Sequence, residues 1–210
     1  MSGIVSQNVA RTSGLIKAVE GGGGTWTAIK TLTSDGSDSD LTFVNGASDV
    51  VLDSTYPIYC FQLINIHPET NNVRLMMNGS DDTSSHAYDI TKISTYFRAY
   101  HLEDDSGQAV AYDADRDSAQ ASGVQQISMP ASNDADANIN GHMYLFSPSS
   151  TTFIKHFLIR INTSASSPNT ADSVIGGYFN TTAAITAIQF SFSSDEIQGG
   201  KIKLFGIKDS

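Results

Sequence analysis

Apolar and polar residues alternate along most of this chain in short runs, separated by Ser, Thr, Gly, Asn and Asp. The last run shows the pattern most clearly: after Gly199 and Gly200, Lys and apolar residues alternate through residues 201–207. A period of two predicts a β-strand with one polar and one buried face. The chain is therefore expected to close on a β-strand over residues 199–207.

The same pattern predicts about ten strands along the chain. They cover residues 26–32, 41–44, 58–66, 73–78, 95–101, 124–129, 142–146, 153–163, 184–192 and 201–207. Residues 58–66 are apolar on both faces except at Gln62 and Asn65, which is typical of a central strand. We expect a short helix over residues 89–94.

Turn-rich loops rather than helical crossovers join these strands, which favours an antiparallel all-β fold. The number of strands and the long loops fit a jelly-roll-like β-sandwich best, with an immunoglobulin-like sandwich as the alternative. The sandwich domain is expected to span residues 25–210. Residues 1–24 are expected to form a separate N-terminal arm.

The predicted arm combines scattered apolar residues with a run of four glycines at residues 21–24. Consecutive glycines favour neither helix nor strand and act as a hinge. A segment this short does not fold alone. Either it adds a strand to its own domain, or it docks on another protein through anchoring residues Ile4, Val5, Leu15 and Ile16.

Charge and composition exclude several classes of protein. The formal net charge is −10, from 12 Lys and Arg against 22 Asp and Glu, which argues against a nucleic-acid-binding surface. No apolar run is long enough to insert into a membrane, and no Sec signal peptide is visible at the N-terminus. Cys60 is the one cysteine, so an intrachain disulfide is impossible and burial as a small apolar residue is expected.

No motif of the common catalytic or cofactor-binding kinds occurs in the sequence. The acidic runs at residues 35–40, 113–117 and 133–136 lack the Gly and Glu positions of an EF-hand loop, so turn formation is favoured over an irregular calcium site. The five histidines lack zinc-site spacing. We therefore expect no enzymatic activity, no metal and no cofactor.

Exposed loops offer candidates for binding instead of catalysis. Tyr88 and Tyr112 can stack on a sugar ring, although tyrosine also buries readily. Asp113 and Asp115 follow Tyr112 in the same loop. These four residues are the candidates for contact with a receptor, and a host surface glycan is a candidate ligand.

Four segments carry a resemblance to a known family: residues 26–32, residues 59–68, residues 147–152 with Lys155-His156-Phe157, and the closing residues 200–207. Together they resemble a β-sandwich structural module of tailed bacteriophages, particularly marine ones. The family's usual ending is Gly-x-Ile-x-Leu-Tyr-Gly-Ile, from which Phe205 is a mild departure. The resemblance covers roughly residues 26–207.

This resemblance implies a virion structural protein that is made in the cytoplasm of the bacterial host. Its expected partners are two further copies of itself, in a homotrimer, and other virion proteins. The first hypothesis is a tail-fibre module, anchored by its arm, that presents residues 81–88, 104–117 and 131–140 to the host. The alternatives are a capsid decoration or cement protein and a carbohydrate-binding module. Copy number separates the first two, because capsid proteins are present in hundreds per particle.

Overall fold

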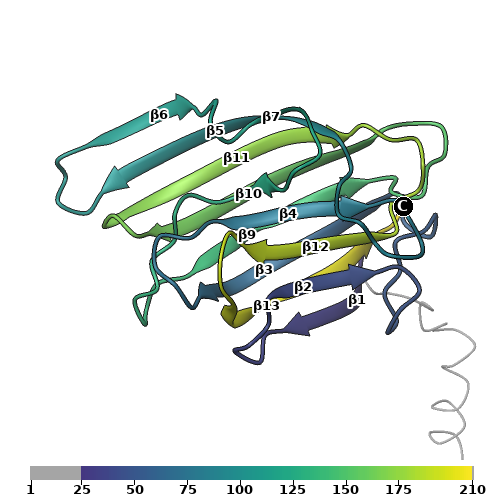
Figure 1. Ribbon diagram of the computed structural model, residues 1–210, viewed down its shortest axis with the longest axis horizontal. Helices are drawn as coiled ribbons and strands as arrows, with labels where there is room; N and C mark the ends of the chain where they lie inside the picture. Colours follow the sequence, from purple (N-terminus) through teal and green to yellow (C-terminus); the bar gives the residue numbers. More distant parts are fainter. Residues whose placement is uncertain (1–24, 210) are drawn as a thin grey trace, which may run out of the picture.

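The computed structural model describes residues 25–209, and this part of the chain is built from β-strands without any helix (Figure 1). The all-β prediction is therefore confirmed. The thirteen strands are β1 (Trp26–Thr33), β2 (Asp40–Val44), β3 (Ile58–Pro68), β4 (Leu75–Ser80), β5 (Lys92–Leu102), β6 (Gln108–Tyr112), β7 (Ser118–Ala121), β8 (Gln125–Gln126), β9 (Ile139–Phe146), β10 (Lys155–Ala165), β11 (Asn169–Phe179), β12 (Ala187–Phe192) and β13 (Ile197–Ile207).

The strands form two antiparallel sheets, as expected of a sandwich. The large sheet has nine strands in the order β1-β13-β3-β9-β10-β11-β5-β6, with β7 also paired to β5. The small sheet has the order β2-β12-β4-β8. A typical jelly roll has eight strands in two sheets, and this sandwich is larger and less equal because β10, β11, β5 and β6 all extend the same sheet.

The hydrophobic core lies between the two sheets, and strict alternation along the strands produces it. In β10, Phe157, Ile159 and Ile161 point inward and are buried, while the residues between them are exposed. Phe61 of β3 packs its ring against Phe43 of β2 and Phe190 of β12, with ring centroids 5.2 and 5.6 Å apart. These aromatic contacts join the large sheet to the small one.

Two lysines are fully buried on the inner side of the large sheet, on either side of Phe179. Lys155 and Lys92 both pair with Phe179 in the sheet register. Lys155 Nζ donates to the carbonyl of Thr181 at 3.1 Å, and Lys92 Nζ donates to the carbonyl of Gly123. Each lysine thus hydrogen-bonds a loop that closes this end of the core.

Some predicted elements were wrong in kind or extent. The helix expected over residues 89–94 does not form, because Ile90, Lys92 and Ser94 are buried in alternation and Lys92 begins β5. Strands β6, β7 and β11 were not predicted. The closing strand is confirmed, but it begins earlier, at Ile197, and Gly200 lies at an irregularity in its pairing with β3.

The molecule has two distinct ends, which are visible in Figure 1. At one end, which we call the terminal end, the backbone N–H of Lys208 donates to the carbonyl of Thr25 at 2.9 Å, so the first and last described segments meet. At the opposite end, the distal end, the N–H of Glu103 donates to the carbonyl of Pro168 at 3.0 Å. An 11-residue strand such as β10 separates the ends by about 36 Å.

The predicted arm, with its anchoring residues Ile4, Val5, Leu15 and Ile16, lies outside the described residues. The described chain begins directly before β1, the edge strand of the large sheet. In residues 25–209, no helix exists that could cross a membrane.

Candidate functional site

The most distinctive surface is the side of the large sheet that faces away from the small sheet, which we call the outer face. Sheet register places its residues in rows that cross several strands. One row runs from Tyr144 of β9 through Leu158 of β10 and Gly176 of β11 to Thr95 of β5. Because alternate residues of these strands fill the core, this row points to solvent.

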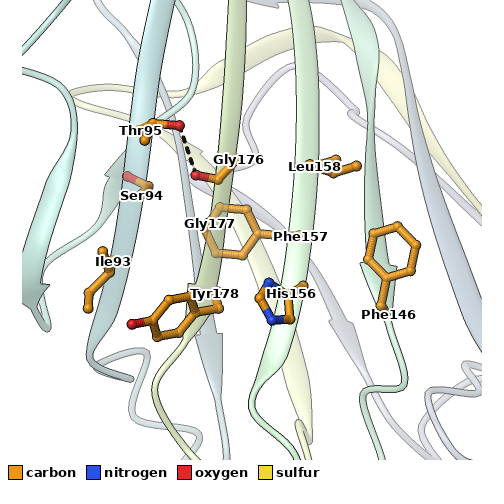
Figure 2. Close-up of a pocket in the computed structure, with 10 residues that line it drawn as sticks. All are labelled: Ile93, Ser94, Thr95, Phe146, His156, Phe157, Leu158, Gly176, Gly177 and Tyr178. Carbon is orange, nitrogen blue, oxygen red and sulfur yellow. Dashed lines mark hydrogen bonds between the residues drawn. The ribbon is translucent and has the colours of Figure 1, made fainter.

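A shallow hollow of about 630 Å³ lies on the outer face across β9, β10, β11 and β5, in the half of the sheet nearer the terminal end (Figure 2). Gly176 contributes no side chain to it, whereas Leu158 and Tyr178 border it. A methyl group added to Gly176 would lie 3.6 Å from Leu158 Cδ2 and 3.8 Å from Thr95 Oγ1, which are ordinary contacts. The hollow therefore has room for an apolar group from outside, and its lining offers few hydrogen-bonding atoms.

Aromatic side chains lie beside this hollow and towards both edges of the outer face. His156 and Tyr178 lie beside each other, with ring centroids 5.5 Å apart, and both border the hollow (Figure 2). Towards one edge, the ring centroids of Trp26 and Phe205 are 5.7 Å apart. Towards the other edge, Phe97 and Tyr112 are 5.2 Å apart in an edge-to-face arrangement.

The exposed apolar residues on this surface come from most of its strands. On the described part of the chain, the large ones on the outer face are Trp26, Phe97, Val110, Tyr112, Leu158 and Val174. All of them except Trp26 lie on the adjacent strands β10, β11, β5 and β6, and exposed apolar residues grouped in this way are typical of a binding surface. The outer face is therefore the candidate functional site of this chain.

A polar patch borders the hollow on the same face, and its members bond to one another. Arg160 binds both carboxylate oxygens of Asp172, through Nε at 3.1 Å and Nη2 at 2.9 Å. Burial, and secondarily the charge of Arg160, lowers the pKa of neighbouring His142. The neutral form of His142 is thereby favoured, and the patch holds little unbalanced charge.

The candidate receptor residues predicted from the sequence do not form one site. Tyr112 and Asp115 are exposed at the β6 edge of the large sheet, but Tyr88 is half-buried and follows β4 of the small sheet. Asp113 is only 6 % exposed and forms ion pairs with Arg98 and Arg116. Its assignment as a receptor-facing residue was therefore wrong, since the two guanidinium groups hold it inside.

The three predicted outward loops also divide between the two ends. Residues 104–107 form the turn between β5 and β6 at the distal end, where residues 132–137 lie beside Glu103 and Pro168 in a shared hollow. Residues 81–88 lie at the terminal end, because Thr186 donates to the carbonyl of Asp82 and the N–H of Ile185 donates to Pro148. Only part of the predicted outward surface therefore faces away from the chain ends.

The acidic loops have the hydrogen bonds of turns. Asp35 Oδ1 accepts from the N–H of Ser37 at 2.9 Å, two residues further on. Asp82 accepts backbone N–H groups from residues 84 to 87, and these bonds, that of Ser85 first, hold its pKa well below the usual range. Among the described residues, no group of three or more His, Cys, Asp or Glu is placed to hold a metal ion.

Cys60 is buried, as predicted, in the outer-face row between Phe205 and Tyr144. Burial raises the pKa of its thiol to about 12, so the thiol stays protonated. His67 is the last residue but one of the central strand β3, and its Nδ1 lies 2.8 Å from the carbonyl oxygen of Ala137. Both residues contribute to structure rather than to a reactive site.

Sequence reasoning identified single exposed tyrosines but missed the outer face. The available signal was the alternation of residues 155–165, which places His156 and Leu158 on the solvent side. This alternation does not show how β10 pairs with β11, and β11 itself was not predicted. Comparison of the chain with protein-family models, with curated proteins and with solved structures gave no match.

Proposed function

We propose that this chain is a structural protein of a tailed-bacteriophage particle, a tail-fibre module that attaches at its terminal end and presents its distal end to the host. Its partners would be other copies of itself, as a homotrimer, and neighbouring virion proteins. The chain acts as a rigid support and display surface, and no chemical step is assigned to it.

The observation that carries the proposal is the opposite placement of the chain ends and two of the expected outward loops. The described chain starts and finishes at the terminal end, where Lys208 bonds Thr25. The turn at residues 104–107 and the loop at 132–137 lie at the distal end. A module attached through its N-terminal arm would therefore hold these loops away from the particle, and loops on a rigid scaffold are the usual place for recognition.

The segments that resemble the phage module support the same proposal, because three of the four come together in space. Residues 26–32, 59–68 and 200–207 lie in β1, β3 and β13, which are adjacent at one side of the large sheet in the order β1-β13-β3. Three of the four resembling segments thus form one packed unit.

Deletion of residues 1–24 tests the proposed attachment. The truncated chain retains every described strand, so it should fold with the far-UV circular dichroism of the full chain. It should fail to join phage particles when it replaces the full chain during infection. A second variant with Ile4, Val5, Leu15 and Ile16 changed to Ser keeps the length and should fail in the same way. Normal incorporation of both variants would refute attachment through the arm.

A further inference from the structure

We propose that the outer face of the large sheet is a self-association surface that a second copy of this chain covers. This inference deepens the proposed function, on which it rests, by assigning the surface through which copies of the module assemble. Three independent features of the described residues support it: area, charge and shape.

The area is sufficient for a stable interface. Eight strands lie side by side from β1 to β6. With about 4.8 Å between strands and about 3.3 Å per residue along strands of 5 to 11 residues, the outer face covers roughly 1,200 Å². A standard protein–protein interface needs about 800 Å² from each partner. About two thirds of the outer face is therefore enough for one copy, and such a contact includes the apolar rows through His156 and Leu158 together with part of the polar row through Arg160.

The distribution of charge favours a second copy over an oppositely charged partner. The chain has a formal net charge of −10. Among the residues that the structure describes, Asp172 is the one acidic residue in the nine strands of the large sheet, and Arg160 already neutralises it. Two copies that meet at the outer face thus bring no unpaired carboxylates together. Lys201 and Lys203 of β13 also point to this face, but β13 is three strands away from β10, so a contact centred on the hollow leaves these lysines at its border. Their acidic loops repel one another elsewhere, which restricts association to this face.

The outer face has both a hollow and projecting side chains, so it can interdigitate with the side chains of a second copy. The hollow at Gly176 is apolar and has the size that large side chains can enter, while Leu158 and Val174 project beside it. Sheets that pack face to face interdigitate projecting side chains with such gaps. A sugar would require more hydrogen-bonding groups than this hollow provides, and the polar groups of the adjacent patch are engaged with one another.

Sedimentation velocity of the full chain over a wide range of concentration tests the inference, with one matched pair of variants. Val174 on the outer face is 45 % exposed, and Val124, in the segment between β7 and β8, is 47 % exposed. Val174→Asp should raise the dissociation constant at least about tenfold, because association would bury a second carboxylate near Asp172, and Arg160, which lies opposite residue 174, already binds Asp172. Val124→Asp should leave the dissociation constant unchanged.

Gly176→Leu provides a second test that introduces no charge. Its side chain would occupy the hollow, and the open space above Gly176 allows the monomer to keep its fold. It should also weaken association, and far-UV circular dichroism of both outer-face variants should match that of the wild type. A complex of two chains would place the outer faces of both copies against each other, and a complex of three would place each outer face against a different surface of the next copy. Either complex supports the inference, provided that the outer-face variants dissociate it.

Three results would overturn the inference: a monomeric wild-type chain at all concentrations, equal effects of the two valine substitutions, or unchanged association of both outer-face variants. These results are distinguishable from failure of the proposed function. A monomeric chain that is still present in phage particles refutes only the self-association surface. A chain that self-associates but is absent from particles refutes the role in the virion.

Discussion

Phe61→Ala tests the aromatic contact that joins the two sheets. The Phe61 ring is fully buried and contacts Phe43 and Phe190 of the small sheet at centroid distances of 5.2 and 5.6 Å. Truncation removes the buried ring and leaves a cavity, which costs about 3–5 kcal/mol for a buried Phe. Since domains are stable by about 5–15 kcal/mol, this is a large share of the total.

Equilibrium unfolding in urea, followed by far-UV circular dichroism, measures this loss. The midpoint should fall while the dependence of the free energy of unfolding on urea concentration stays constant, which indicates an unchanged unfolding reaction. All proteins must be compared at one concentration, because self-association adds to apparent stability. Phe153→Ala is the control: this residue is 71 % exposed, so its truncation should change the free energy by less than about 0.5 kcal/mol. A loss below about 1 kcal/mol for Phe61→Ala would refute the sandwich contact.

Two further predictions concern pH and backbone geometry. Burial lowers the pKa of Lys92 to about 8 from the ordinary lysine value of 10.5. Between pH 8 and pH 10.5, Lys92 is mostly neutral in the folded chain and mostly protonated in the unfolded chain. The free energy of unfolding therefore rises with pH across this range, by up to about 3 kcal/mol in total. The free energy of unfolding of Lys92→Met should lack this rise, and parallel pH profiles of the two proteins would contradict it. Gly200→Ala should cost about 1–3 kcal/mol by thermal or urea unfolding, because Gly200 has a φ of 102° and its added methyl would collide with the backbone of Asn65. Gly199→Ala, with its nearest contact at 3.9 Å, should be nearly neutral, and equal losses would contradict the geometry.

Strands with uniform alternation could be predicted from the sequence. Residues 58–66 and 201–207 are predicted as strands because their apolar residues repeat with a period of two or fill both faces, and they form most of β3 and most of β13. The all-β sandwich follows from many such runs joined by turn-forming residues.

The missed strand β11 and the start of β5 contain residue types that are more common in turns and on surfaces than in buried strands. β11 is fully paired between β10 and β5, but it contains Asn169, Asp172, Ser173 and the glycines 176 and 177. Small residues are suitable at these positions because neighbouring side chains occupy the space: the Phe157 ring covers Gly177. At the start of β5, the buried Lys92 interrupts the apolar alternation, so the sequence did not predict a strand there.

The candidate site could not be predicted because no single segment carries it. The hollow combines β5, β9, β10 and β11, and only the sheet register brings Thr95, Gly176 and Leu158 into one row. The prediction that Asp113 faces a receptor was wrong for a related reason. Its ion pair with Arg98 depends on the fold, and the local sequence shows only an acidic loop.

Counting the copies of this chain in purified phage particles tests the central claim most directly. Quantitative mass spectrometry would compare peptides of this chain with those of the major capsid protein in the same particles. A tail-fibre module predicts from a few to a few tens of copies per particle. Absence from the particles would contradict the proposed role in the virion, and hundreds of copies would contradict its place in the tail.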